Sequence, residues 1–137
     1  MNLTVLIEIL SLFFCIIRYK KLNPSYLKWF LPLIVLTNIV EWGNFFKLFT
    51  YHHSNNWIYN IFNPIEFCFY GWFYYNYITN SVKRKIILYT CIILVVAYIL
   101  NMLFIQGMVF FNSYTFLLGC LLMIYFTYLY FDQSIKS

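Results

Sequence analysis

The sequence predicts an all-α fold, a polytopic membrane helix bundle of about five transmembrane helices that form one domain over residues 1–137. Hydrophobic residues make up 64% of the chain and charged residues 9%, whereas soluble domains average about 45–50% and about 25%. The apolar residues gather in stretches close to the ~20 residues that cross about 30 Å of hydrocarbon. The polar stretches between them are too short to form a separate soluble core. We therefore expect any function to lie in or beside the lipid bilayer.

The predicted spans are residues 3–17, 29–49, 57–78, 86–105 and 109–131. The first is short, and its flanking residues extend it at the interfaces. Aromatic residues flank the second and third spans, as expected of side chains that anchor helices at a membrane surface. Only Gln106, Gly107 and Met108 separate the fourth span from the fifth. Their combined length favours two crossings over a single hairpin that dips into the membrane.

Basic residues fall almost entirely on one side of this topology. All but Lys47 lie in the first or third connection or near the C-terminus, at Arg18, Lys20, Lys21, Lys28, Lys83, Arg84, Lys85 and Lys136. The positive-inside rule makes that side cytoplasmic, with the N-terminus outside, and we expect a multi-pass protein of the bacterial inner (plasma) membrane. Short basic clusters beside apolar runs are typical of membrane flanks, so we expect the lipid bilayer as a partner and no nucleic acid.

Acidic residues show the reverse of their usual distribution, because three of the four lie inside predicted spans. At about 1.5 Å per residue, Glu8, Glu41 and Glu66 each lie roughly 15–18 Å from the cytoplasmic edge. A charged side chain within the bilayer costs about 2.5–3.5 kcal/mol or more, so these helix faces should turn toward one another or toward a wet cavity. The candidate buried polar layer comprises Glu8, Glu41, Glu66, Asn38, Asn44, Asn63 and Asn101.

The role of this layer has two interpretations. Three close carboxylates cannot all be charged without cations, so they would share protons, as in a proton relay, a cation site or a pH-sensitive switch. Alternatively, each carboxylate has a structural role. In the order Asn63-Pro64-Ile65-Glu66, Asn63 would cap a helix that begins near Pro64, and Glu66 would complete a capping box. Glu8 would reach the outer surface, and Glu41 would hold two helices together by hydrogen bonds.

Other chemical motifs are weak. The sequence has no Gly-rich phosphate loop, G-x-S-x-G or H-E-x-x-H motif, so we assign no catalytic residue. His52 and His53 are adjacent and cannot clasp one metal as an i, i+4 pair would. We expect no metal and no cofactor. The cysteines occur singly and are expected to be reduced, buried fillers, at Cys15, Cys68, Cys91 and Cys120.

Several short motifs carry a resemblance to known proteins. The basic RYKK after the first span, NWIYN at residues 56–60 and Ile65-Glu66-Phe67 before an aromatic helix resemble a group of small uncharacterised multi-pass membrane proteins of the Bacteroidota. This resemblance implies an inner-membrane location and no established activity. Pro64-Ile65-Glu66 is also similar, more faintly, to the membrane lycopene cyclase domain, whose motif has two glutamates after proline and one residue. Phe67 stands in place of the second, so one acid expected to protonate a polyene is missing.

The sequence leaves three hypotheses for function. An accessory or structural membrane subunit, as a homo-oligomer or as a partner in a membrane complex, is favoured by the small size and the lack of motifs. A proton- or cation-linked carrier or sensor is favoured by the carboxylate layer. A membrane enzyme acting on an isoprenoid or lipid is suggested by Glu66 beside the aromatic run at residues 70–75. An enzyme is the less favoured class.

Overall fold

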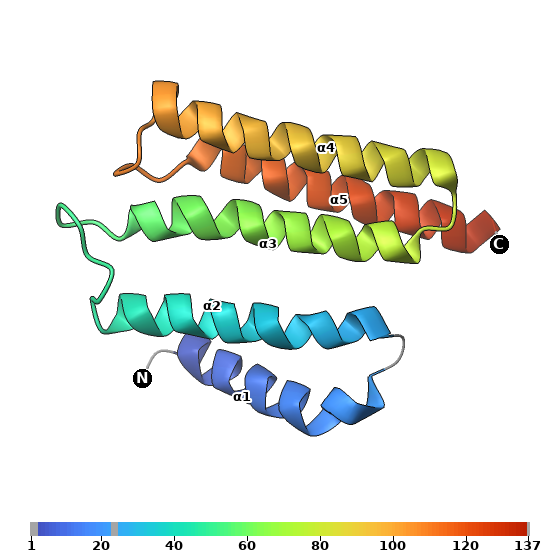
Figure 1. Ribbon diagram of the computed structural model, residues 1–137, viewed down its shortest axis with the longest axis horizontal. Helices are drawn as coiled ribbons and strands as arrows, with labels where there is room; N and C mark the ends of the chain where they lie inside the picture. The colour runs from blue at the N-terminus through green and yellow to red at the C-terminus, as the bar shows by residue number, and fades with distance from the viewer. Residues whose placement is uncertain (1–2, 23–24, 137) are drawn as a thin grey trace. The chain divides into compact units, whose positions relative to one another are not determined.

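The computed structural model describes residues 3–22 and 25–136, with side chains from residue 6 onward except at 23–26 (Figure 1). Over these residues the chain is all-helical and has no strand, which confirms that the fold is all-α. Two 3-10 helices, η1 and η2, join the first two α-helices, and a π-helix, η3, continues α4. The elements are α1 (Leu3–Arg18), η1 (Tyr19–Lys21), η2 (Ser25–Trp29), α2 (Phe30–Phe45), α3 (Asn56–Tyr77), α4 (Ser81–Leu100), η3 (Asn101–Ile105) and α5 (Ser113–Lys136).

The chain divides into two compact units. An N-terminal unit, Met1–Thr50, contains α1 and α2, and a C-terminal unit, Tyr51–Ser137, contains α3, α4 and α5. Each unit is defined by the packing of its own helices. That residues 1–137 form one domain therefore stays a prediction.

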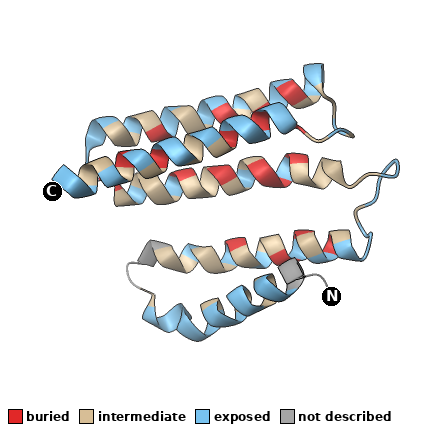
Figure 2. Cartoon of the chain, turned by 180° about the vertical axis from the view of Figure 1, so that it is seen from behind, coloured by how far each residue is buried: buried red, intermediate tan, exposed pale blue. Residues whose placement is uncertain are grey.

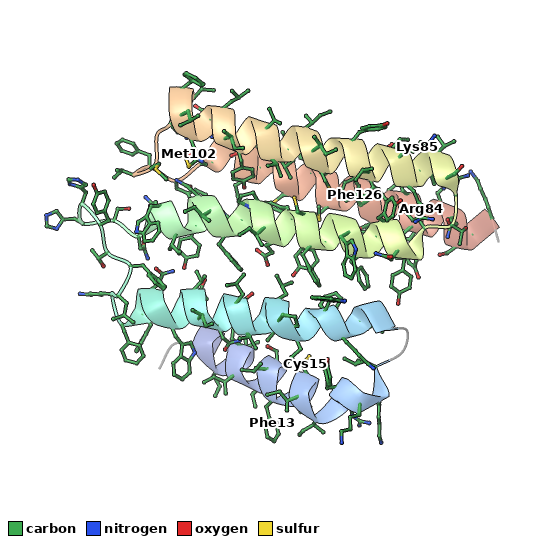
Figure 3. The ribbon with its side chains drawn as sticks, in the orientation of Figure 1. Phe13, Cys15, Arg84, Lys85, Met102 and Phe126 are labelled. Atoms are coloured by element: carbon green, nitrogen blue, oxygen red, sulfur yellow. The ribbon has the colours of Figure 1, made fainter. Side chains whose placement is uncertain are left out.

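The N-terminal unit is a pair of helices with a narrow contact. On α1 the half-buried residues Glu8, Leu12 and Cys15 recur at i, i+4 and i+7, so they share one helical face. Most other apolar residues of α1 are exposed, and Phe13 points away from α2 (Figure 3). A pair of helices with this much exposed apolar surface requires an apolar surrounding or a partner to be stable.

Helix α2 ends four residues before the predicted span does. A Cβ atom at Gly43 would collide with the ring of Phe49, so glycine at this position allows the residues after α2 to fold back over the helix. Lys47 completes the turn in the left-handed backbone region, with φ of 58°. The packing of one aromatic ring six residues along the chain, which hydropathy does not report, therefore accompanies this boundary.

The C-terminal unit is a bundle of three helices with a continuous apolar interior, as Figure 2 shows by the buried residues along α3, α4 and α5. At one end Ile78, Ile87, Phe126 and Leu129 form the core. A second cluster, nearer the middle of the helices, consists of Phe67, Leu94 and Tyr98. Glycine allows close approach at two helix contacts, because a Cβ at Gly71 would collide with Cys91 and one at Gly119 with Phe67.

Helix α3 runs through Pro64 instead of beginning near it. The helix begins at Asn56, so the interpretation of Asn63 and Glu66 as the cap of a helix start is wrong. Proline has no N–H to give to the preceding turn and normally breaks a helix interior. Here the turns before Pro64 are held by hydrogen bonds from Asn56 and Asn60 to the connection between α4 and α5.

The boundaries of the last two helices also differ from the predicted spans. Helix α4 begins at Ser81, five residues before the predicted span, because the Asn80 side chain accepts hydrogen bonds from the N–H groups of Val82 and Lys83 at 3.0 and 3.1 Å. Helix α5 begins at Ser113 instead of residue 109. The carbonyl groups of Val109 and Phe110, just before this helix, accept hydrogen bonds from side chains of α3.

Two helices among the described residues are long and apolar enough to cross a membrane. They are Ser81–Ile105 and Ser113–Lys136, whose most apolar 18-residue stretches have mean hydropathies of 2.5 and 1.6. Helices α1 and α2 have 16 residues each, or about 24 Å at about 1.5 Å per residue. Helix α3 has 22 residues but carries several asparagines and a glutamate, which lower its hydropathy. Five crossings remain a prediction.

Candidate functional site

The residues predicted to form one polar layer are divided between the two units. Asn38, Glu41 and Asn44 lie on α2 with Glu8 facing from α1, whereas Asn63, Glu66 and Asn101 belong to the C-terminal unit. The single layer of three carboxylates stays a prediction.

In the N-terminal unit the structure brings Glu8 and Glu41 close enough for their charges to interact. Both are half-buried, and the Glu8 Oε2 atom is buried without a hydrogen bond to any described residue. The same holds for both polar atoms of the Asn44 side chain. Asn38 is buried and donates from Nδ2 to the Ile34 carbonyl at 2.8 Å, so it serves its own helix. Glu8 and Asn44 therefore keep side-chain polar atoms that no described residue binds, whereas the Asn38 amide is bonded within its own helix.

The largest group of buried polar side chains lies in the C-terminal unit, in the half of the bundle that contains the α4–α5 connection. We call this group the amide cluster. Its members are all buried: Asn60, Asn63, Asn101, Asn112 and Thr115. The sequence had singled out Asn63 and Asn101, and it missed Asn60 and Thr115. The spacing of Asn56, Asn60 and Asn63 at i, i+4 and i+7 on one helical face was the available signal.

Asn60 is the most fully used member of the cluster. Its Nδ2 donates to the carbonyl oxygens of Met108 and Phe110 at 3.0 and 2.8 Å, and its Oδ1 accepts from the Asn112 N–H at 2.9 Å. An amide can do this because it carries both donors and an acceptor. One side chain of α3 thus replaces the internal hydrogen bonds that a regular turn would give this connection.

Two further residues at the start of α3 bind the same segment. Asn56 donates from Nδ2 to the Val109 carbonyl at 3.1 Å, and the Ser54 hydroxyl donates to that oxygen at 3.3 Å. The Ser54 Oγ also accepts from the Asn56 N–H at 3.1 Å, which satisfies a free donor at the helix start. The beginning of α3 and residues 108–112 therefore form one hydrogen-bonded assembly.

Asn101 lies where α4 changes to the π-helix η3, a distortion that is frequent at functional sites. Its Nδ2 donates to Gln106 Oε1 at 2.7 Å and to the Thr115 hydroxyl at 3.4 Å. The Thr115 hydroxyl in turn donates to the Asn112 carbonyl at 3.1 Å. The wider turn thus directs Asn101 toward α5 and links the two helices.

Some polar atoms of this region have no hydrogen bond to any described residue. They are both side-chain polar atoms of Asn112, the Asn101 Oδ1 and the hydroxyl of Tyr98, which lies near Thr115 and Asn63. Asn112 is fully buried. A buried amide or hydroxyl without a partner costs about 1–3 kcal/mol. The amide cluster therefore binds the connection and still retains buried polar atoms that no described residue binds.

Glu66 lies one turn along α3 from Asn63 and is half-buried. Its Oε1 accepts a long hydrogen bond, 3.4 Å, from the Tyr70 hydroxyl. This bond joins residues at i and i+4 of the same helix, so it does not link α3 to another helix.

Charged residues hold the opposite end of the C-terminal unit. Asp132 of α5 forms ion pairs with Lys136 and Lys83, each at 2.7 Å. The hydrogen bond from Lys136, and to a smaller extent that from Lys83, lowers the pKa of the Asp132 carboxyl group. Gln133 Oε1 accepts from the backbone N–H groups of Thr79 and Asn80 at 2.8 and 3.3 Å. The α3–α4 connection is thus fastened to the end of α5.

The described residues contain no group of three His, Cys, Asp or Glu side chains that could hold a metal ion. His52 and His53 occupy a tight turn, both with positive φ, closed by two backbone hydrogen bonds between Tyr51 and Ser54 at 2.8 and 2.9 Å. Each described cysteine has a free thiol.

Comparisons of the sequence with protein-family models, with curated proteins and with solved structures gave no match. Function is therefore inferred from the geometry of the chain itself.

Proposed function

We propose that this chain is an integral, multi-pass membrane protein. The observation that carries this is the exposure of its most apolar helices. In Ser81–Ile105 the most apolar 18-residue stretch has a mean hydropathy of 2.5 and is only 22% buried, and the corresponding stretch of Ser113–Lys136 is buried to the same share. A helix that is apolar on all sides belongs in the core of a large soluble protein or in a bilayer. With so little of these helices buried by the chain, lipid is the surrounding that suits them.

The proposed topology has five crossings, with the basic connections on the cytoplasmic side. Helices α1 and α2 are each somewhat shorter than about 30 Å of hydrocarbon, and the 3-10 helices between them lie in a segment rich in lysine and tyrosine that suits an interface. Arg84 and Lys85 lie in the first turns of α4, at the same proposed side. The turn at His52 and His53 would then be outside.

Within the membrane, we propose the role of a structural or accessory subunit, as a homo-oligomer or as a partner in a larger complex. The bonding of the amide cluster supports it. Asn60 of this cluster, and Asn56 one turn before it, donate their side-chain hydrogen bonds to backbone carbonyl groups of the α4–α5 connection. They therefore fix this connection in place. Buried polar groups used in this way give a bundle one defined arrangement. The many exposed aromatic and aliphatic side chains leave ample surface for helix contacts with a partner.

Cysteine labelling tests the membrane proposal. The native cysteines are first replaced by alanine, and a single cysteine is then placed at His52 or at Lys85, both of which are exposed. A membrane-impermeant maleimide should label His52→Cys in intact cells and Lys85→Cys only after lysis. Labelling of both sites in intact cells, or the reverse pattern, would contradict the topology. Release of the protein from membranes by alkaline carbonate would contradict insertion itself.

The subunit role has its own test. Native mass spectrometry of the protein extracted in a mild detergent should show a defined homo-oligomer or a complex of fixed composition. A monomer that carries no second chain under several detergents, and that remains monomeric after cross-linking in the membrane, would refute the role while leaving membrane insertion intact.

A second candidate function is proton- or cation-linked transport or sensing. The proximity of Glu8 and Glu41 favours it, because two interacting carboxylates in an apolar helix pair share a proton or bind a cation more readily than either alone. The test is the joint replacement of Glu8, Glu41 and Glu66 by glutamine. A pH-dependent change in infrared carboxyl bands or in proton uptake by vesicles should disappear in this variant. If the wild-type protein shows no such pH dependence, the candidate is eliminated.

A further inference from the structure

An apolar groove of about 380 Å³ runs between α3 and α4. Its lining comes from Cys68, Gly71, Trp72 and Tyr75 on α3 and from Leu88 and Cys91, among others, on α4. Trp72 is 38% and Leu88 48% exposed, so the groove opens to the surface of the unit. From Cys68 to Tyr75 it extends about 10 Å along the helix axis.

A single guanidinium group stands at one end of this groove. Arg84 lies 4.2 Å from the ring centroid of Tyr75, which is a lining residue. Stacking on an aromatic ring holds the planar guanidinium in a fixed direction. The Arg84 Nε is buried without a hydrogen bond to any described residue. The cation is therefore positioned by the groove and is not neutralised by a described carboxylate.

The neighbouring lysines are placed differently. Lys83 pairs with Asp132 and donates to the Leu129 carbonyl at 3.3 Å, so it is bound to α5. Lys85 is exposed and leaves α4 on a different side from Arg84 (Figure 3). Among these consecutive basic residues, Arg84 is the one that stacks on a groove residue. The three side chains therefore differ in role although they share one charge.

We propose that this groove binds one anionic phospholipid, with an acyl chain against Trp72 and Leu88 and the phosphate group on Arg84. An arginine fork matches a phosphate with two parallel hydrogen bonds. Arg84 also lies in the first turn of α4, where the helix dipole favours an anion. Basic pockets between helices on the cytoplasmic side of a membrane are sites where anionic headgroups bind. The inference rests on the proposed insertion into a membrane and on its orientation.

Trp72 provides the measurement, because it lines the groove. The other tryptophans, Trp29, Trp42 and Trp57, are replaced by phenylalanine, and the full chain is reconstituted in vesicles of one fixed mixture of phosphatidylcholine and phosphatidylglycerol. In one preparation the phosphatidylglycerol has brominated acyl chains, and in the other an equal amount of phosphatidylcholine has them. Bromine quenches tryptophan fluorescence on contact, so the two preparations compare the lipids beside Trp72 at identical membrane composition.

We expect brominated phosphatidylglycerol to quench Trp72 more strongly than brominated phosphatidylcholine, by the amount that an enrichment of about fivefold or more at the groove would give. One basic side chain contributes about 1 kcal/mol to the binding of an anionic lipid, which corresponds to this factor. Arg84→Gln should abolish the enrichment. Lys85→Gln removes the same charge one residue away and should retain most of it. Arg84→Lys, which keeps the charge and loses the planar stack, should fall between wild type and Arg84→Gln. Excess inorganic phosphate in the buffer should change nothing.

The outcomes separate this inference from the proposed function. If neither brominated lipid quenches Trp72, the groove is not in a bilayer and membrane insertion itself fails. If both quench equally, the protein is inserted and the lipid site is refuted. If Arg84→Gln and Lys85→Gln reduced the phosphatidylglycerol enrichment equally, the lipid would be attracted by the general surface charge, and the proposed site would be refuted. Loss of the enrichment in inorganic phosphate would show an anion site on Arg84 without a lipid, which also overturns the proposal. Circular dichroism of each variant checks that the helices are retained.

Discussion

Replacing Asn60 by alanine should destabilise the C-terminal unit more than any other single asparagine change in α3. The side chain is 3% exposed and makes three hydrogen bonds of 2.8–3.0 Å to Met108, Phe110 and Asn112. Alanine at position 60 leaves two carbonyl groups and one N–H without this partner. The connection between α4 and α5 then has few groups that can replace the lost bonds.

The magnitude follows from the number of bonds. One hydrogen bond between membrane helices contributes about 0.6–1.7 kcal/mol, and the net value in soluble proteins is about 1 kcal/mol. Three bonds therefore give a loss of about 2–5 kcal/mol in the free energy of unfolding. Asn76→Ala is the matched control, since Asn76 is an exposed asparagine of the same helix that donates to the Trp72 carbonyl within that helix. Its effect should stay within about 0.5 kcal/mol.

Reversible unfolding in mixed micelles, followed by circular dichroism as the denaturing detergent increases, gives the free energy for each variant. Hydrogen exchange adds a local readout, because the Asn112 N–H donates directly to Asn60 and should lose protection. The reasoning is refuted if Asn60→Ala costs no more than Asn76→Ala, or if the Asn112 N–H remains as protected as in the wild type.

Two other predictions use the same assay. Gly71→Ala should destabilise the bundle by about 1–3 kcal/mol, because its Cβ would collide with Cys91, and the double variant with Cys91→Ala should recover part of the loss; additive losses would contradict this contact. The lysines Lys83 and Lys136 lower the pKa of Asp132, which lies beyond the last proposed span, so its ion pairs stabilise the fold above about pH 3.9, the unfolded aspartate value. This contribution is lost as the pH falls through the folded pKa. A stability titration of Asp132→Asn should lack that acid-side loss, and an unchanged profile would show that the ion pairs contribute nothing.

The sequence predicts the helices best where hydropathy alone sets their limits. Helix α1 ends one residue from the predicted span, and α3 differs by one residue at each end. It fails where a boundary depends on a specific side-chain contact. Phe49 packs over Gly43, six residues away, where α2 ends early, and Asn60 donates to a carbonyl group before α5. Hydropathy reports neither contact, and the second joins residues that are far apart in sequence.

The candidate site was only partly predictable, for a chemical reason. Carboxylates stand out in an apolar sequence, so the prediction centred on Glu8, Glu41 and Glu66. The structure shows a larger buried cluster built on amides, with Asn60 at its centre. Asparagine is common in this chain, and its presence alone does not say whether it is buried. The i, i+4, i+7 spacing at Asn56 was present, but the identity of its partner could be known only from the fold.

The two ends of the C-terminal unit are fastened by different chemistry, and this has a physical consequence. Neutral amides hold residues 108–112 to α3, and their hydrogen bonds keep their strength whatever the pH. Ion pairs hold Lys83 to Asp132 at the other end, where acid protonates the carboxylate and salt screens the charges. Neutral groups also cost less to desolvate than charged ones, so the amides suit the buried end and the ion pairs the partly exposed one. Acid or salt should therefore loosen the α4–α5 contact near Lys83 first and leave the protection of the Asn112 N–H unchanged.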